Sequence, residues 1–208
     1  MTGLALAYAA LCGVTRARSM GEGGDLDVSL FDVALSNLGY PAMWYLNNGH
    51  VQKRLARSAH PSLTPCQLYK TADGWIYLMC NKEKFWLALS EALGHPEWAD
   101  DPRFKTFSER FAARPEIQDM LDQALQTRTT AEWLADFAGV VPAAPILDVG
   151  EALENSFVKD QGRLQDIELD GFGTYRYLRP PVQADDPAPA NPAPKLGQHT
   201  DALLAEIG

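Results

Sequence analysis

The sequence predicts an α+β fold in which helices cover a small antiparallel sheet. In residues 64–80, two runs rich in aromatic and β-branched side chains flank Asp73 and Gly74. An Asp-Gly turn between such runs is a strong short-range signal for a β-hairpin. Residues 164–178 predict a second hairpin that turns at residues 170–173. Most of the remaining chain has the apolar spacing of amphipathic helices.

The composition indicates a globular protein that does not bind nucleic acid. Of the 208 residues, 46% are hydrophobic and 22% are charged, which is the balance of a folded domain. The net charge is -9 and no basic stripe is present, so a nucleic-acid partner is not expected. The apolar run at residues 4–14 is too short to cross a membrane, and its arginines follow it, unlike those of a signal peptide. We expect a cytoplasmic protein without a membrane partner.

The three cysteines predict neither a disulfide framework nor a zinc site. Cys12, Cys66 and Cys80 are odd in number and form no Cys-x-x-Cys pair. Buried free thiols are the simplest interpretation. The histidines also lack partners at ligand spacing, so no metal site is expected.

The segments before the first hairpin are expected to be helical, with one strand between them. Residues 2–19 are rich in Ala and Leu and predict a helix. Residues 25–30 alternate polar and apolar side chains and predict a short strand, and residues 31–47 predict a second helix. The polar, basic residues 48–62 favour an exposed tether. Because residues 75–80 are almost wholly apolar, both faces of that strand are expected to be buried.

Four helices, an edge strand or extended segment, a proline-rich strap and a last helix are expected after the first hairpin. The predicted helices lie at residues 82–93, from about 108 to 125, from a cap at Thr129 through Phe137, and at 148–154. The apolar face of the helix at residues 82–93 is expected to consist of Phe85, Leu87, Leu89 and Leu93. A capping box is expected at the start of the third helix, because Thr129 and Glu132 have the required spacing. Residues 140–147 suggest an edge strand or an extended segment. The six prolines of residues 180–194 favour an extended strap before a last helix near residues 196–207.

The side chains by themselves suggest no catalytic constellation. His60 lies in a loop before the first hairpin, where a solvated histidine is favoured over a substrate-binding one. Asp100 and Asp101 are adjacent on a turn and point apart, which does not suit shared acid-base chemistry. The glycine-rich residues 21–24 follow a helix, whereas a phosphate loop joins a strand to a helix. The tryptophans Trp75, Trp98 and Trp133 are most simply core anchors.

Several short motifs together resemble the second half of the family III CoA-transferases of the CaiB/BaiF type. This group includes formyl-CoA transferase and carnitine CoA-transferase, and α-methylacyl-CoA racemases share its fold. The resemblance rests on these segments, in chain order: Thr2-Gly3 at the head of an Ala/Leu helix, residues 21–32, residues 60–62, residues 70–75, residues 100–104 and residues 196–200. Each motif is weak alone, but together they cover the whole chain.

The resemblance implies a specific domain arrangement. Family members have a large Rossmann-like domain, formed by both ends of the chain, and a smaller α+β domain between them, and they form interlocked homodimers. Residues 1–47 and 179–208 would then belong to the large domain, residues 48–64 would be a linker with an active-site loop, and residues 65–178 would form the small α+β domain.

The resemblance also implies acyl-CoA:carboxylate CoA transfer through an aspartate nucleophile. That aspartate lies just ahead of the Thr-Gly that matches Thr2-Gly3, so we expect no catalytic residue in this chain. Coenzyme A and acyl-CoA would be substrates, with no permanently bound cofactor, and a carboxylic acid would be the second substrate. The expected partner is a second copy in a homodimer, or a missing N-terminal half.

The substrate or CoA contacts that the resemblance implies are Leu30, His60, Pro61, Ser62 and Leu63. In the formyl-CoA branch a glycine-rich loop stands where residues 58–64 lie here, and this stretch has no glycine. Because of this difference from the formyl-CoA branch, the sequence does not identify the acyl group of the substrate. A racemase-like enzyme and a non-catalytic binding or assembly subunit remain as alternatives.

Overall fold

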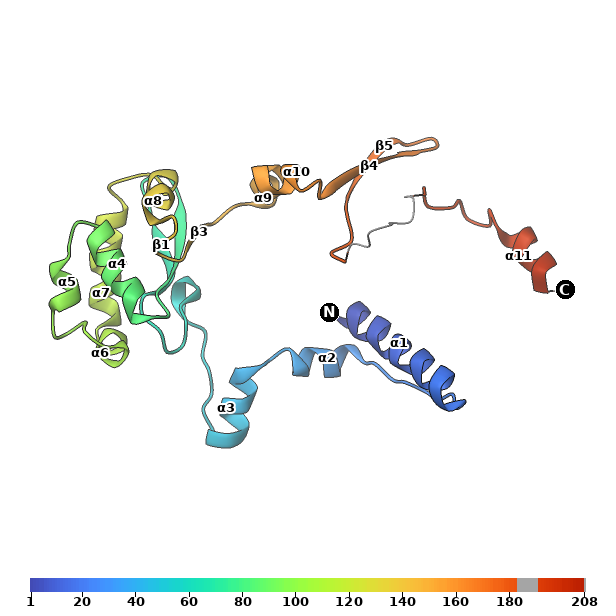
Figure 1. The fold of residues 1–208 in the computed structure, drawn as a ribbon, viewed down its shortest axis with the longest axis horizontal. Coiled ribbons are helices and arrows are strands. Elements are labelled where there is room, and N and C mark those ends of the chain that lie inside the picture. Colours follow the sequence, from blue (N-terminus) through green and yellow to red (C-terminus); the bar gives the residue numbers. More distant parts are fainter. Residues whose placement is uncertain (183–190, 208) are drawn as a thin grey trace. The chain divides into compact units, whose positions relative to one another are not determined.

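The structure, a computed structural model, describes residues 1–182 and 191–207. The chain divides into two compact units, Met1–Ala144 and Pro145–Gly208. The boundary lies inside the range 65–178 that the sequence analysis assigned to one domain, and the four-part division stays a prediction. Figure 1 gives the order of the elements along the chain.

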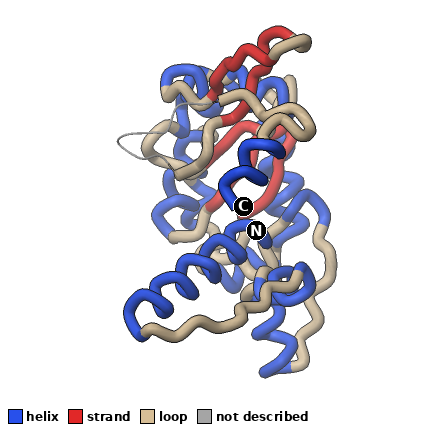
Figure 2. The backbone as a smooth tube through the Cα atoms, turned by 90° about the vertical axis from the view of Figure 1, so that its right-hand side faces the viewer, coloured by secondary structure: helices blue, strands red, loops and turns tan. Residues whose placement is uncertain are grey.

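The predicted first hairpin is confirmed. Strand β1 (Cys66–Lys70) pairs antiparallel with β2 (Trp75–Met79), and β3 (Ala143–Pro145) lies on the other side of β2. The backbone N–H of Thr71 donates to the carbonyl of Gly74 at 3.0 Å and closes the turn. The strands are red in Figure 2. The predicted edge strand is therefore also present, though it is shorter than residues 140–147.

Only one face of β2 is buried within the described residues, so the prediction for both faces was wrong. Ile76 and Leu78 have 0% of their surface exposed, whereas Trp75 and Met79 are about two-fifths exposed. Successive side chains of a strand point to opposite faces, and the helices cover only one of them. Trp75 is consequently not a core anchor, whereas Trp133 is buried as expected.

Five helices of the first unit lie between β2 and β3 in the chain. They are α4 (Glu83–Ala92), α5 (Glu97–Asp100), α6 (Phe107–Ala112), α7 (Arg114–Leu125) and α8 (Thr130–Phe137). The central core residues of α7 are Ile117, Leu121 and Leu125, each fully buried. On α4 the buried residues include Trp86 and Leu89, while Leu87 is half exposed. The predicted apolar face was wrong at Leu87, because residues three or four apart share a helix face.

Local sequence signals fix where the later helices start. Thr129 and Glu132 form the predicted capping box, with the Thr129 hydroxyl accepting from the Glu132 N–H. The single helix expected up to residue 125 is divided into α6 and α7. Pro115 stands in the first turn of α7, where its missing N–H costs no helical hydrogen bond. Thr106 caps α6 with Glu109 in a second capping box.

The N-terminal segment contains three helices rather than two helices and a strand. Helix α1 (Thr2–Met20) confirms the first prediction, and α2 (Leu30–Ser36) and α3 (Tyr40–Asn48) replace the single helix at residues 31–47. The strand predicted at residues 25–30 was wrong. Ser29 instead caps α2, because its hydroxyl accepts the Asp32 N–H at 3.0 Å.

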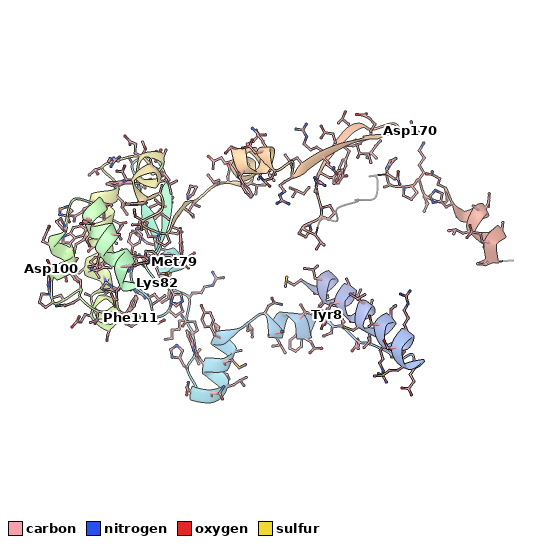
Figure 3. All side chains as sticks on the ribbon, in the orientation of Figure 1. Tyr8, Met79, Lys82, Asp100, Phe111 and Asp170 are labelled. Carbon is pink, nitrogen blue, oxygen red and sulfur yellow. The ribbon has the colours of Figure 1, made fainter. Side chains whose placement is uncertain are left out.

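The helices α1, α2 and α3 bury none of their own residues. Leu4 and Leu11 of α1 are more than half exposed, and so is Tyr8, labelled in Figure 3. Cys12, expected to be a buried thiol, is also exposed. Across the described residues, no helix combines the length and apolar character that crossing a membrane requires.

This apolar surface predicts self-association of the isolated chain. Sizing chromatography should give an apparent mass well above the 22.9 kDa of one chain, together with binding of a dye for apolar surface. The physical reason is that side chains such as Leu4 and Tyr8 gain from any contact that removes them from water. A sharp monomer peak without dye binding would contradict the prediction.

The second unit contains the second predicted hairpin, and its formation is confirmed. Strands β4 (Leu164–Leu169) and β5 (Gly173–Leu178) pair antiparallel, and Asp170, labelled in Figure 3, lies in their turn. The helices are α9 (Val149–Glu154), α10 (Ser156–Asp160) and α11 (Thr200–Ile207). Most of the proline-rich strap, residues 183–190, lies outside the described residues, so that prediction stays open.

Candidate functional site

The candidate site is the His60 loop, which we define as residues 60–64, immediately before β1. It follows a short 3-10 turn, η1 (Ala56–Ser58), in which Arg57 and Ser58 have φ of 56° and 51°. Non-glycine residues seldom adopt this left-handed region, and where they do the surrounding contacts must hold them there.

Arg57 supplies such contacts, and it corrects the prediction that residues 48–62 form only an exposed tether. Its guanidinium donates to both carboxylate oxygens of Asp122 on α7 at 2.7 Å. It also lies 5.6 Å from the centre of the Trp75 ring on β2. A charged hydrogen bond and a cation–π contact therefore attach this end of the tether to two other elements.

The backbone of His60 is integrated into the sheet edge. Its N–H donates to the carbonyl of Cys66 at 2.8 Å, which extends the hydrogen bonding of β1. Its imidazole Nδ1 accepts the backbone N–H of Ser62 and of Leu63, both at 3.2 Å. The ring lies 6.4 Å from the Tyr40 ring, centre to centre. His60 is thus an ordered turn residue and not a freely solvated loop histidine.

Arg114, at the start of α7, holds the carbonyl groups of the loop. Its Nη2 donates to the carbonyls of His60 at 2.7 Å and Leu63 at 3.1 Å, and its Nε donates to the Thr64 hydroxyl at 2.9 Å. Three donors of one rigid guanidinium therefore meet three acceptors of a five-residue segment. The planar fork of arginine suits such multiple contacts better than the single ammonium of lysine.

Arg110 of α6 holds the end of the loop from inside the core. It is fully buried, and its Nε donates to the Thr64 carbonyl at 3.1 Å. Its remaining nitrogens donate to the Phe104 carbonyl at 2.8 Å and to Glu83 Oε2 at 2.6 Å. Every nitrogen of this buried charge thereby has a partner, which is the condition for burying a guanidinium at tolerable cost.

Sequence reasoning missed both arginines. The available signal was their spacing of four residues among Phe107, Phe111 and Ala113, which places two cations on an apolar stretch. Their acceptors in the His60 loop, however, are 46 to 54 residues away in the sequence. No local pattern relates a cation to acceptors at that separation.

The structure brings four of the five predicted contact residues together. His60, Pro61, Ser62 and Leu63 form one turn beside Arg114. Leu30 is separate from this turn: it is the first residue of α2 and is 76% exposed. The roles of all five residues remain predictions.

Acidification is expected to weaken the His60 loop. Burial, and secondly the charge of Arg114, lowers the pKa of His60 below its ordinary value of 6.5. As the pH falls below 6.5, His60 of the unfolded chain takes up a proton, whereas His60 of the folded loop stays neutral until a lower pH. The contribution of the neutral ring to the stability of the fold is therefore complete above pH 6.5 and is lost as the pH falls through the folded pKa. Hydrogen exchange at Ser62 and Leu63, corrected for intrinsic rates, should accelerate in this window. Equal acceleration in His60→Asn would contradict the assignment.

Three other titratable side chains, those of Cys80, His95 and Asp101, have surroundings that suit a structural role. Burial raises the pKa of the Cys80 thiol to about 12, which does not suit a nucleophile. His95 bonds to Glu97 and stacks on Trp98 with 4.2 Å between ring centres, and Asp101 pairs with Arg103. In the ranges 1–182 and 191–207, no three His, Cys, Asp or Glu side chains are grouped to hold a metal ion. That no metal binds stays a prediction.

Comparison with known proteins identifies the family. The sequence pattern of CoA-transferase family III matches residues 1–200. The chain belongs to this family. This family III chain is 30% identical to the succinate–glutarate CoA-transferase of Agrobacterium fabrum, over 99% of the chain and 52% of the relative. It is 29% identical to the acetyl-CoA:oxalate CoA-transferase of Acetobacter aceti, over 94% of the chain and 51% of the relative.

Solved structures support the fold. A CaiB/BaiF family protein from Brucella suis is 31% identical, with a TM-score of 0.78 over 100% of this family III chain and 54% of its own length. The Rv3272 protein of Mycobacterium tuberculosis, 22% identical with a TM-score of 0.84, shares the fold. The chain spans about half the length of these relatives. The family resemblance and the α+β fold class are thus confirmed.

Proposed function

We propose that this chain takes part in acyl-CoA:carboxylate CoA transfer and contributes the His60 loop to the acyl end of the site. Membership of the family over residues 1–200 is the observation that carries the proposal. The names of the relatives, which transfer CoA to oxalate or between succinate and glutarate, support the same substrate class. The acyl group and the acceptor of this chain stay open.

In the proposed reaction, coenzyme A enters and leaves as a substrate. An aspartate carboxylate attacks the thioester carbonyl of the donor and displaces the CoA thiolate. The product of this step is an acyl-aspartyl anhydride. The thiolate then attacks the aspartyl carbonyl, which releases the donor acid and forms an aspartyl-CoA thioester. The acceptor carboxylate attacks this thioester and displaces the CoA thiolate, and a second anhydride forms. The thiolate attacks the acceptor carbonyl of that anhydride, which gives the new acyl-CoA and the free aspartate. The nucleophile is proposed to come from residues outside these 208, and the residues of this chain would bind and orient. Leu30 is proposed to lie near the CoA.

The partner is proposed to be a second copy of the protein, or the half of the family enzyme that these 208 residues do not cover. The proposed location of the protein is the cytoplasm. The exposed apolar side chains of α1 support pairing of either kind. The same observation favours a second candidate function, in which the chain is a non-catalytic subunit that assembles with another protein.

The decisive experiment compares this chain with a version extended upstream through the expected aspartate. Both are incubated with a panel of acyl-CoA donors and carboxylate acceptors, and intact mass is measured to detect a covalent CoA adduct. We expect the adduct and turnover in the extended protein alone. Exchange at the acyl α-carbon without an adduct would replace the proposal by a racemase-like activity, and no chemistry in either protein would favour the assembly subunit.

A further inference from the structure

We propose that His60 is held as its neutral Nε2–H tautomer and donates a hydrogen bond from Nε2 to an oxygen of the carboxylate substrate. This inference deepens the proposed function and rests on it for the identity of the ligand. The tautomer itself rests on contacts within the His60 loop.

The first step concerns the proton on the ring. Two backbone N–H groups, those of Ser62 and Leu63, are directed at Nδ1 at 3.2 Å. The Ser62 hydroxyl lies 3.4 Å from the same nitrogen, and it can donate to Nδ1 once the two N–H groups have made Nδ1 the acceptor. A nitrogen that accepts a hydrogen bond cannot carry a proton in the same direction, so Nδ1 is the unprotonated nitrogen. In a neutral imidazole the proton then lies on Nε2.

The second step concerns the orientation of the ring. The His60 N–H is bonded to Cys66, and the His60 carbonyl is bonded to Arg114. Arg114 also holds the Leu63 carbonyl, so the N–H groups that face Nδ1 belong to a fixed turn. Rotating the ring by half a turn would place a C–H where Nδ1 now accepts two N–H groups. The loop therefore fixes which nitrogen faces the turn and leaves Nε2 as the other one.

The third step concerns the free nitrogen. Within the part of the chain that the structure describes, the His60 ring makes its hydrogen bonds through Nδ1 and none through Nε2, and His60 is only half-buried. A neutral N–H is a donor without acceptor capacity, which suits a carboxylate oxygen and not a cation. The neighbouring Arg114 guanidinium makes the surroundings positive, and this favours the same anionic ligand.

Two substitutions separate the support of the turn from the contact with the ligand. In His60→Asn, the side-chain oxygen can replace Nδ1 as acceptor in an Asx-type turn, but no donor reaches the position of Nε2. In His60→Gln, the longer amide restores a distal N–H without the acceptor beside the backbone. If Nε2 contacts the ligand, Gln should retain more binding than Asn.

The tautomer is tested on this chain by long-range ¹H–¹⁵N correlation, with His60→Asn to assign the signals. We expect a protonated Nε2 and an unprotonated Nδ1 above the ordinary histidine pKa. A protonated Nδ1 would overturn the inference whether or not the protein transfers CoA. Glutarate is then added as the carboxylate probe to this chain and to the extended protein, and we expect the Nε2 signal to shift in at least one of them. No shift in either would overturn the donor role.

Kinetics on the extended protein separate this inference from the proposed function. His60→Asn should raise the KM for the carboxylate about tenfold, the usual effect of losing a hydrogen bond to a charged group, while kcat changes far less. Hydrogen exchange of the loop should be unchanged in this variant. An unchanged KM in an active enzyme would overturn the donor role alone, whereas a wild-type protein without CoA transfer would refute the proposed function and leave the tautomer result standing.

Discussion

Replacing Arg110 by methionine is expected to lower the free energy of unfolding by about 3–5 kcal/mol. Arg110 is fully buried and donates to the carbonyls of Thr64 and Phe104. Methionine fills a similar volume but leaves both acceptors without a donor, and a buried group without its partner incurs its whole desolvation cost. The His60 loop should also exchange its backbone hydrogens faster, because Thr64 ends it.

The matched control is Arg103→Met. Arg103 pairs with Asp101 and Glu116, but its side chain is 60% exposed, so its loss should change stability by less than about 1 kcal/mol. Urea unfolding followed by tryptophan fluorescence reports on this unit through the buried Trp86 and Trp133. Equal losses for Arg103→Met and Arg110→Met would show that burial does not determine the effect.

Replacing Trp86 by alanine is expected to cost about 3–5 kcal/mol, whereas replacing the adjacent Leu87 should cost less than about 1 kcal/mol. Trp86 is 1% exposed and packs edge-on against Phe104 with 6.2 Å between ring centres. Its truncation leaves a cavity that the surrounding core cannot fill. Leu87 is 51% exposed, so its side chain gives up little buried surface.

The same urea unfolding experiment measures both variants. Similar midpoints for Trp86→Ala and Leu87→Ala would contradict the assignment of the buried face of α4. Both variants place alanine, a good helix former, at neighbouring positions of α4, so helix propensity should change little in either. Circular dichroism of the two folded variants should therefore show the same helix content.

Local sequence determined the elements whose signals act over a few residues. The turn at Asp73 and Gly74 and the capping box at Thr129 formed where predicted, because each depends on atoms within one turn. The strand expected at residues 25–30 did not form, and this too was decided by neighbouring atoms. The hydroxyl of Ser29 capped a helix there, a local alternative that the polar–apolar alternation does not reveal.

Burial was harder to predict from sequence, because it depends on which faces meet. The apolar pattern of β2 did not distinguish the buried Ile76 and Leu78 from the exposed Trp75. On α4 the apolar pattern predicted a buried Leu87, whereas the side chain buried at this point is the adjacent Trp86. Both errors arise because apolar side chains occur on the two faces of each element, and only packing against a neighbour decides which face leaves water.

The sequence by itself therefore determined the family, the α+β class, both hairpins and the position of the His60 loop. Only the tertiary structure identified Arg110 and Arg114 as the residues that hold this loop, and it alone showed which nitrogen of His60 accepts the backbone N–H groups. The physical reason is range. Turns and caps are decided by neighbouring residues, whereas Arg110 and Arg114 reach their acceptors in the His60 loop only after distant segments have packed together.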